Sequence, residues 1–304
     1  MKFIKALRAL IATVSLVACS NTPEPPPLDT IAEGKPALWK VTGSKPEQKG
    51  SAFLFGTIHI LPKGVNWRTP ALEEAIASSD RLVIEVLGLE DTENAARIFS
   101  RLAISPNQPE IEMRIKPSLR DDLDAVIDKS SIPEFALNRM ESWAAALSLA
   151  SAQTNALGLD SSEGVEKKLV AQYEGLKKPV EGLETIEQQL GYFDTLPETQ
   201  QRDMLASVVE EAADAKSSFE KLFNAWISGD TETIVDLSEG GILEDPKTRE
   251  KLLVARNQDW TEQLDKKLQS PGISFVAVGA AHLVGPDAVQ AMLEKRGYKI
   301  EKIQ

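Results

Sequence analysis

Residues Ala52–His59 have the sequence AFLFGTIH, an apolar run that ends in Gly-x-x-His. Near the other end of the chain, residues Phe275–His282 have the sequence FVAVGAAH and end in the same motif. Apolar runs of this length, rich in Phe, Leu and Val, are typical of strands covered on both faces of an α/β sheet. We therefore predict two buried strands, each followed by a Gly-x-x-His turn.

These two motifs contain the only histidines of the chain, His59 and His282. Gly56 and Gly279, at the predicted strand ends, lack a Cβ and allow the backbone to turn or to approach a ligand closely. In open α/β sheets ligands bind beyond the carboxyl ends of the strands, so both imidazoles can share one crevice. Histidine is the commonest neutral metal ligand and titrates near neutral pH. A lone histidine here is more simply a structural residue, whereas the matched pair favours a functional site.

The composition is that of an ordinary globular protein, with 42% of the 304 residues hydrophobic and 26% charged. The formal net charge is −12, and it becomes −15 when an N-terminal segment with three basic residues is removed. Nucleic-acid binding depends on Lys and Arg that neutralise phosphates. We therefore expect no nucleic-acid partner, and repulsion between the domain and anionic lipid.

The N-terminal segment, residues 1–18, has the features of a signal peptide, because a basic start precedes a short apolar stretch. It leads into Leu16-Val17-Ala18-Cys19, which resembles the lipobox of bacterial lipoproteins. That resemblance implies lipidation of Cys19 and a protein of the bacterial cell envelope, anchored on the periplasmic face, at the outer membrane if the cell is Gram-negative. The alternatives are an incidental cysteine or cleavage after Ala18. Residues 19–33, rich in proline, are typical of an extended tether.

Residues 34–304 are predicted to form a single α/β domain. We expect a central mixed, largely parallel sheet built from two related halves, with a large helical insertion at about residues 90–155 and 195–270 that covers the site. The expected strands are 37–42 and 51–55 as a hairpin, then 81–86, 156–160, 178–183, 273–278 and an edge strand at 298–303. The expected helices are 70–77, 117–129, 136–153, 162–173, 185–193, one or two within 197–227, then 230–237, 246–268 and 286–295.

Three acidic residues lie at or near the ends of predicted strands: Glu85, Asp160 and Glu184. Burying an unpaired carboxylate costs free energy, so Glu85 either points out of the sheet or is paired. It is a salt-bridged structural residue, or else a metal ligand or general base beside His59. Asp160 is more simply the cap of the helix that follows it.

One further pair of polar residues, Arg256 and Asn257, falls within the predicted helix 246–268. An arginine on a helix usually faces solvent. The sequence contains no phosphate-binding loop, dinucleotide-binding fingerprint, His-Glu-x-x-His or Gly-x-Ser-x-Gly motif. Cys19 is the only cysteine, so the mature domain has no disulfide and no thiolate metal ligand.

Taken together, these motifs resemble those of the TraB/GumN family, within the wider group that includes the Tiki proteases and the ChaN and erythromycin-esterase-like proteins. The resemblance extends from Leu38 to Ile303. It depends on the two Gly-x-x-His stretches, the strand with Glu85, and three short motifs: Gly158-Leu159-Asp160, Gly182-Leu183-Glu184-Thr185 and Arg256-Asn257. It implies a two-half α/β fold in which both histidine motifs and the acidic residues form one site. Tiki members are metal-dependent proteases, whereas bacterial GumN-type members mostly lack assigned substrates.

The first hypothesis is therefore a membrane-tethered, metal-dependent hydrolase that acts on a peptide or protein. His59, His282 and Glu85 are its predicted metal ligands, and Mn, Co, Fe or Zn suits two imidazoles and a carboxylate. Glu85, Glu184 and Arg256 are the predicted catalytic residues, with Gly56, Gly279, Asp160 and Asn257 in support. Arg256 either stabilises a developing oxyanion or pairs with Glu85, and in the second case it is part of the scaffold.

Two other hypotheses remain open at this point. In one, His and Glu side chains act as general acid and base in a metal-independent, esterase-like hydrolysis. In the other, the chain is a lipoprotein that binds a peptide without cleaving it.

Overall fold

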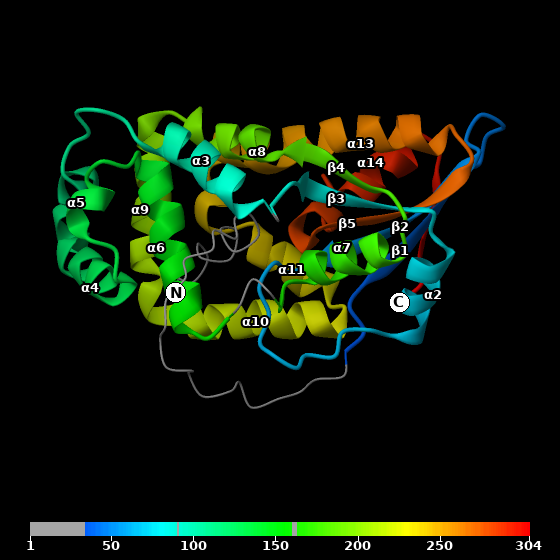
Figure 1. Ribbon diagram of the computed structural model, residues 1–304, viewed down its shortest axis with the longest axis horizontal. Coiled ribbons are helices and arrows are strands. Elements are labelled where there is room, and N and C mark those ends of the chain that lie inside the picture. The colour runs from blue at the N-terminus through cyan, green and yellow to red at the C-terminus, as the bar shows by residue number, and fades with distance from the viewer. Residues whose placement is uncertain (1–33, 90, 160–162) are drawn as a thin grey trace.

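Six strands form one mixed sheet in the order β4-β3-β5-β2-β1-β6 (Figure 1). The computed structural model describes residues 34–89, 91–159 and 163–304. The predicted signal peptide, Cys19 and its tether, and Asp160 lie outside the described residues. The strands are β1 (Leu38–Thr42), β2 (Gly50–Thr57), β3 (Arg81–Leu87), β4 (Val180–Thr185), β5 (Gly272–Gly279) and β6 (Lys299–Lys302).

The sheet is largely parallel, as the sequence predicts. β4, β3, β5 and β2 run parallel to one another, while β1 pairs antiparallel with β2 and with the edge strand β6. The two strands that carry the Gly-x-x-His motifs are direct neighbours, and Thr57 of β2 lies opposite Gly279 of β5. The predicted hairpin and C-terminal edge strand are also confirmed.

Each face of the sheet has its own apolar core. On one face, Val83 of β3 and Val276 of β5 pack with Trp260 and Leu264 of α13 (Ala255–Leu268) and with α14 (Val289–Lys295). On the other face, a larger core joins the sheet to α2 (Pro70–Ser78), α7 (Val165–Gly175) and α10 (Ala215–Ser228). Both faces of the central strands are therefore covered, which explains why their sequences are continuously apolar instead of alternating.

A group of helices extends the larger core beyond the end of the sheet (Figure 1). α6 (Ser142–Ala156) lies at its centre and has buried residues on all sides, as expected for a helix that is apolar all round. Other helices are α3 (Thr92–Ala103), α4 (Arg120–Ser130), α5 (Glu134–Leu137), α8 (Ile186–Asp194), α9 (Glu198–Glu210) and α11 (Thr231–Ser238). They correspond to the predicted helical regions.

The predicted strand 156–160 is wrong for the residues that the structure describes. α6 continues to Ala156, and Gly158 has a φ of +72°, a left-handed conformation that ends a helix. The amide of Leu159 then donates to the carbonyl of Thr154. A helix C-terminus with its glycine therefore occupies the place of the predicted strand.

The predicted helix 246–268 is interrupted. It consists of α12 (Pro246–Arg249), a π-helical turn (Glu250–Val254) and α13. The amide of Ala255 donates to the carbonyl of Glu250, five residues back. π-turns inside helices are rare and frequently occur at functional sites. Other predicted boundaries also shift, because α4 begins at Arg120, a break at 138–141 separates α5 from α6, and α14 begins at Val289.

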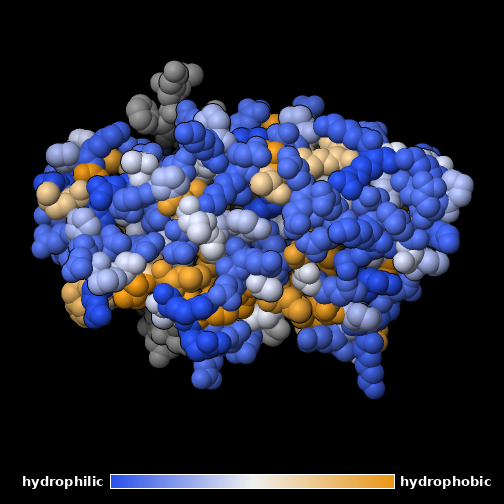
Figure 2. All heavy atoms as spheres, turned by 90° about the horizontal axis from the view of Figure 1, so that it is seen from above, coloured by the Kyte–Doolittle hydropathy of each residue, from blue (hydrophilic) through white to orange (hydrophobic). Residues whose placement is uncertain are grey.

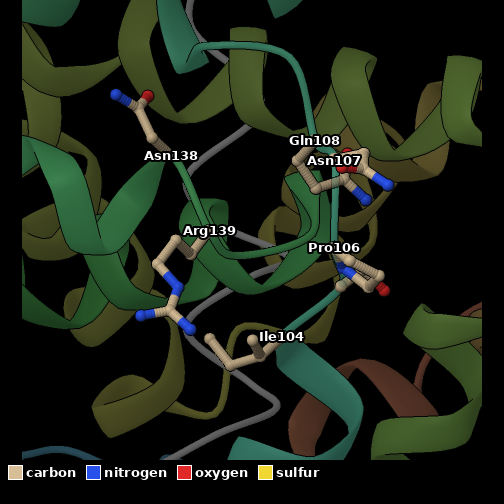
Figure 3. Close-up of a pocket in the computed structure, with 7 residues that line it drawn as sticks. Ile104, Pro106, Asn107, Gln108, Asn138 and Arg139 are labelled. Carbon is tan, nitrogen blue, oxygen red and sulfur yellow. The ribbon is translucent and has the colours of Figure 1, made fainter.

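Figure 2 shows the molecule from above relative to Figure 1. The surface seen from this side is mostly hydrophilic, and apolar residues gather in a narrow band. Within the described ranges, no helix is long and apolar enough to cross a membrane. One pocket of about 320 Å³ lies at the helical end of the molecule (Figure 3). It is lined by residues 104–108, Asn138 and Arg139, so none of the predicted site residues contributes to it.

Gly56 is required because the two motif strands approach each other closely. A Cβ at this position would lie 3.1 Å from Cα of Ala280, and the Gly56 carbonyl accepts a 2.7 Å hydrogen bond from the indole of Trp226. We expect Gly56→Ala to lower the free energy of unfolding by about 1–3 kcal/mol through overpacking. Urea denaturation measures this change.

Gly191 is the matched control, because it lies within α8 and a Cβ there meets nothing within 4 Å. Gly191→Ala should leave stability unchanged or raise it by up to about 1 kcal/mol. Equal stability of Gly56→Ala and Gly191→Ala would contradict the proposed close approach.

Candidate functional site

The carboxyl ends of four neighbouring strands lie at one edge of the sheet. β3 carries Glu85, β4 carries Glu184, β5 ends at Gly279 just before the 3-10 turn that contains His282, and β2 ends at Thr57, two residues before His59. Glu85, Glu184 and His282 are all buried. This edge is where ligand sites form in α/β sheets.

Arg256 is the centre of the arrangement. Its Nη2 donates to Oε1 of Glu85 at 2.5 Å, and its Nε and Nη2 donate to the two carboxylate oxygens of Glu184, each at 2.8 Å. Its side chain is 2% exposed. Arg256 therefore pairs with Glu85, which is the alternative that makes it part of the scaffold, and it also forms a bidentate pair with Glu184.

Alternation along β3 and spacing along α13 explain why Glu85 and Arg256 meet. Val83 and Glu85 lie on the same face of β3 because side chains two residues apart point the same way. That face packs against the buried side of α13, where Arg256 and Trp260 are four residues apart. The π-turn directly before α13 also contributes, because the carbonyl of Leu252 accepts from Nη1 of Arg256 at 3.1 Å.

Further donors fix the two carboxylates. The side-chain Nε2 of Gln189, on α8, donates to Oε1 of Glu85 at 2.7 Å. The backbone amide of Gly279 donates to Oε2 of Glu85 at 3.3 Å. The indole of Trp260 donates to Oε1 of Glu184 at 2.8 Å. Both carboxylates are thus surrounded by donors, which is the condition for burying them.

Aromatic rings enclose the guanidinium. Cζ of Arg256 lies 4.8 Å from the ring centroid of Trp260 and 5.4 Å from that of Tyr192, within the range of cation–π attraction. The ring of Trp260 also contacts that of His282, with centroids 4.3 Å apart.

A fixed tautomer of His282 follows from its hydrogen bonds. Nδ1 of His282 lies 2.6 Å from Oδ1 of Asn257, whose Nδ2 donates to the carbonyl of Asp287 at 2.7 Å. Because that second bond orients the Asn257 amide, its oxygen faces the imidazole, and Nδ1 carries the proton. Nε2 then has the lone pair, and it lies 3.4 Å from Nη1 of Arg256.

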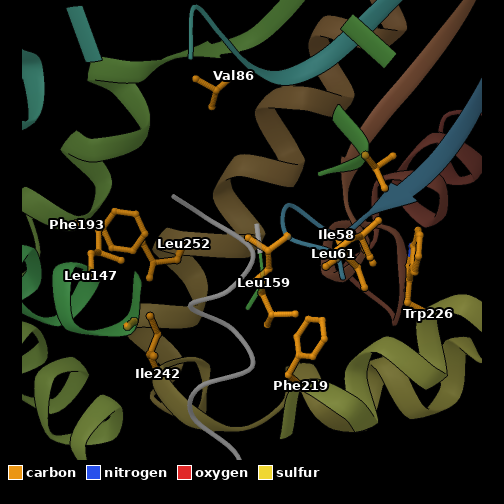
Figure 4. Packing of buried hydrophobic residues seen from close by; sticks show 14 of the residues in the cluster. Ile58, Leu61, Val86, Leu147, Leu159, Phe193, Phe219, Trp226, Ile242 and Leu252 are labelled. Atoms are coloured by element: carbon orange, nitrogen blue, oxygen red, sulfur yellow. The ribbon is translucent and has the colours of Figure 1, made fainter. Parts of the chain in front are cut away.

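His59 lies two residues beyond the end of β2 and is less buried than His282. Its Nδ1 is 2.7 Å from Oε1 of Glu166, on α7. The flanking Ile58 and Leu61 point into the apolar core near Leu159 (Figure 4), which anchors the turn on both sides of the imidazole.

The cluster shifts the protonation of its members. Burial alone would raise the pKa of Glu85, but Arg256, His282 and His59 outweigh burial and lower that pKa from 4.5 to about 2. Burial, together with the charge of Arg256, lowers the pKa of His282 from 6.5 to about 3. Burial raises the pKa of Glu184, although Arg256 opposes this effect. At neutral pH, Glu85 is therefore ionised and His282 is neutral.

The sequence profile of the TraB/PrgY/gumN family matches residues 37–302. The chain belongs to the TraB/PrgY/gumN family. An uncharacterized protein of Treponema pallidum (strain Nichols) is 24% identical over 281 residues, which are 88% of this chain and 82% of that protein. The uncharacterized protein YbaP of Escherichia coli (strain K12) is 23% identical over 240 residues, 79% of this chain and 86% of that protein. YbaP of Shigella flexneri matches equally well. No solved structure matches the chain significantly.

The predicted site residues of this TraB/PrgY/gumN-family chain have different surroundings. Glu85, Glu184, Arg256, Asn257 and His282 form one hydrogen-bonded cluster. His59 pairs with Glu166 on α7. Among residues 34–89, 91–159 and 163–304, no three His, Cys, Asp or Glu side chains are arranged as a group that could hold a metal ion. Gly56 and Gly279 support the site through close packing and through the amide that contacts Glu85.

Three further residues that bond to predicted site residues are absent from the sequence prediction: Glu166, Gln189 and Trp260. Trp260 has a detectable signal, because it lies four residues after Arg256 on one helix face. Glu166 and Gln189 lie on helices that the sequence does predict, but nothing in their local sequence indicates which helix face contacts the sheet edge.

Removing Arg256 should be costly because two buried carboxylates would lose their shared cation. We expect Arg256→Gln to lower the free energy of unfolding by about 3–5 kcal/mol, measured by urea denaturation near neutral pH. Arg101 is the matched control, since it pairs with Glu187 and both side chains are more than half exposed. Arg101→Gln should cost less than about 1 kcal/mol, and equal losses in the two variants would contradict the buried triad.

The pH dependence of stability should reflect His282. Between the unfolded pKa of 6.5 and the folded pKa of about 3, the unfolded chain binds a proton that the folded chain excludes. The contribution of His282 to the free energy of unfolding is therefore fully present above about pH 6.5. On acidification below that pH, the free energy of unfolding falls by up to about 1.4 kcal/mol per pH unit. The contribution of Glu85 is lost only below 4.5, as the pH falls towards about 2.

The corresponding measurement is urea unfolding at about pH 7 and about pH 5, where His282 titrates in the unfolded chain. We expect His282→Asn to show a smaller loss of stability than the wild type over this interval. An equal loss in both proteins would mean that His282 is not buried in its neutral form.

Proposed function

We propose that this TraB/PrgY/gumN-family protein is a metal-dependent hydrolase that cleaves peptides, with His59, His282 and Glu85 as the metal ligands. The supporting observation is the arrangement around His282: Asn257 holds its Nδ1 proton, and its Nε2 lone pair is directed toward the cluster that contains Glu85. A metal ion binds imidazole in its neutral form and carboxylate in its ionised form.

The proposed ligands are of residue types that bind divalent cations, although among the described residues they are not arranged as a three-ligand group. Two imidazoles and a carboxylate suit Mn, Co, Fe or Zn. The lowered pKa values of Glu85 and His282 agree with this role, because both groups are already deprotonated at neutral pH. The same values argue against either group as a general base near neutrality, for which a pKa close to the working pH is best.

A bound divalent ion would supply Lewis acidity, polarising a scissile carbonyl and lowering the pKa of a water molecule. The residues of the chain have separate tasks. Glu184 and Trp260 hold Arg256 in place, Arg256 and Gln189 orient Glu85, and Asn257 orients His282. Arg256 is thus assigned to positioning, and not to contact with an oxyanion.

A second candidate, metal-independent and esterase-like hydrolysis, is favoured by one specific observation. The cation that contacts Glu85 in this structure is Arg256 itself. In this candidate the Arg256–Glu85 pair persists throughout turnover, and chelators have no effect. Peptide binding without cleavage is the third possibility.

We propose further that the protein is tethered to the cell envelope through lipidated Cys19, with a peptide or protein as substrate. This part of the proposal rests on the sequence Leu16–Cys19 and on the composition of the segments around it. The acidic domain makes an acyl chain, and not surface charge, the means of membrane contact.

Metal content tests the proposal directly. The chain from Asn21 is loaded separately with Mn, Co and Zn, and bound metal per chain is measured by elemental analysis. We expect one metal ion per wild-type chain and loss of that ion in both His59→Ala and His282→Ala, with circular dichroism to verify folding. Glu187→Gln is the matched control, since Glu187 is exposed and pairs with Arg101.

Absence of bound metal from the wild-type chain would contradict the metallohydrolase. A peptide-library screen with and without chelator then separates the alternatives. Cleavage that survives the chelator supports the second candidate, and binding without cleavage supports the third.

A further inference from the structure

We propose that Glu166 is a positioning residue that fixes the tautomer of His59, in the same way that Asn257 fixes that of His282. The catalytic meaning of this inference rests on the proposed metal site, but the tautomer itself does not. Glu166 belongs to neither Gly-x-x-His motif and comes from α7, more than a hundred residues beyond His59 in the sequence.

Three contacts join the start of α7 to the turn that carries His59. Oε1 of Glu166 lies 2.7 Å from Nδ1 of His59. The hydroxyl of Thr57, the last residue of β2, donates to the same carboxylate oxygen. The backbone amide of Val165 donates to the carbonyl of Ile58 at 3.3 Å. Side chain and backbone together therefore hold Glu166 against the motif.

The chemistry of these contacts specifies which ring nitrogen carries the proton. An ionised carboxylate only accepts hydrogen bonds, so Nδ1 of His59 must be the donor. In the neutral imidazole, Nε2 then has the lone pair. Glu166 lies in the first turn of α7, where the helix dipole stabilises a negative charge.

The second Gly-x-x-His motif also has a hydrogen-bond acceptor at Nδ1 of its histidine, supplied by a different residue. Asn257, on α13, accepts from Nδ1 of His282, and its amide is oriented by the carbonyl of Asp287. Both histidines thus donate through Nδ1 to a helix residue and have the lone pair on Nε2. Each Gly-x-x-His turn supplies an imidazole, and a helix from outside the motif sets its tautomer.

This arrangement is the one that metal-binding histidines use, in which an acceptor behind the ring fixes the orientation and raises the basicity of the ligating nitrogen. Loss of such an acceptor lowers metal affinity about 10- to 100-fold. Glu166→Ala should therefore weaken binding of Mn, Co or Zn by this factor, if the metal site itself is correct.

The tautomer is measured by NMR on the full chain labelled with 15N at histidine, without added metal and at about pH 9, well above the ordinary imidazole pKa of about 6.5. Because the chain contains two histidines, there are four ring nitrogens, and protonated and unprotonated nitrogens resonate far apart. In the wild type we expect both rings to be protonated at Nδ1 alone. In Glu166→Ala we expect His59 to shift toward the Nε2-protonated tautomer, while His282 is unchanged.

Three variants serve as controls. Glu166→Gln retains an acceptor oxygen and should preserve much of the wild-type pattern at His59. Glu163→Ala removes a nearby carboxylate that pairs with Lys168 instead and should leave both rings unchanged. Asn257→Ala should alter His282 alone. The unchanged histidine in each variant reports that the chain has folded.

The proposal is overturned if wild-type His59 carries its proton at Nε2, or if Glu166→Ala leaves its Nδ1 proton in place. Failure of the metal site is a separate result. A wild-type chain that binds no metal but shows the expected tautomers contradicts the hydrolase proposal and retains the role of Glu166 in orienting His59.

Discussion

The ion pairs of Arg256 with Glu85 and Glu184 are the constraint on which the rest of the site depends. Each of these three charges would be too costly to bury alone, since removing an isolated charge from water costs several kcal/mol or more. Together they bring β3, β4 and α13 to one point and determine how α13 packs across the sheet. The π-turn before Arg256 and the rings of Trp260 and Tyr192 then complete the surroundings of the guanidinium.

This constraint explains why a buried polar cluster adjoins two apolar cores. Buried ion pairs of this kind contribute little net stability relative to apolar residues of similar size. They do specify one geometry, because a bidentate arginine–carboxylate pair tolerates little rotation. The cluster fixes Glu85 and leaves His282 beside it as a neutral acceptor, while His59, on the turn after β2, pairs with Glu166. The charges of Arg256, Glu85 and Glu184 are therefore held in fixed positions relative to His282.

Much of the fold can be predicted from the sequence, because continuously apolar runs such as Ala52–Phe55 indicate buried parallel strands. The residue types of the candidate site can also be predicted, since the two matched Gly-x-x-His motifs and the acidic residues at strand ends are recognisable in the sequence. Three features cannot. The strand at 156–160 is mistaken because a short apolar stretch beside a helix C-terminus resembles a strand. The π-turn leaves no signal in the hydrophobic pattern. The contact of Glu166 with His59 depends on the packing of α7, which no local propensity specifies.

The position of β5 has a consequence for how the protein is made. β5 lies between β2 and β3 in the sheet, although it follows both by most of the length of the chain. Until that strand has been synthesised, β2 and β3 have no shared neighbour and the larger core remains open on one side. Such distant pairing is slow to form, and it leaves apolar strand edges exposed in the meantime. In a nascent chain the central part of the sheet therefore cannot form until β5 is inserted between β2 and β3. A chain that ends before Gly272 lacks both β5 and His282.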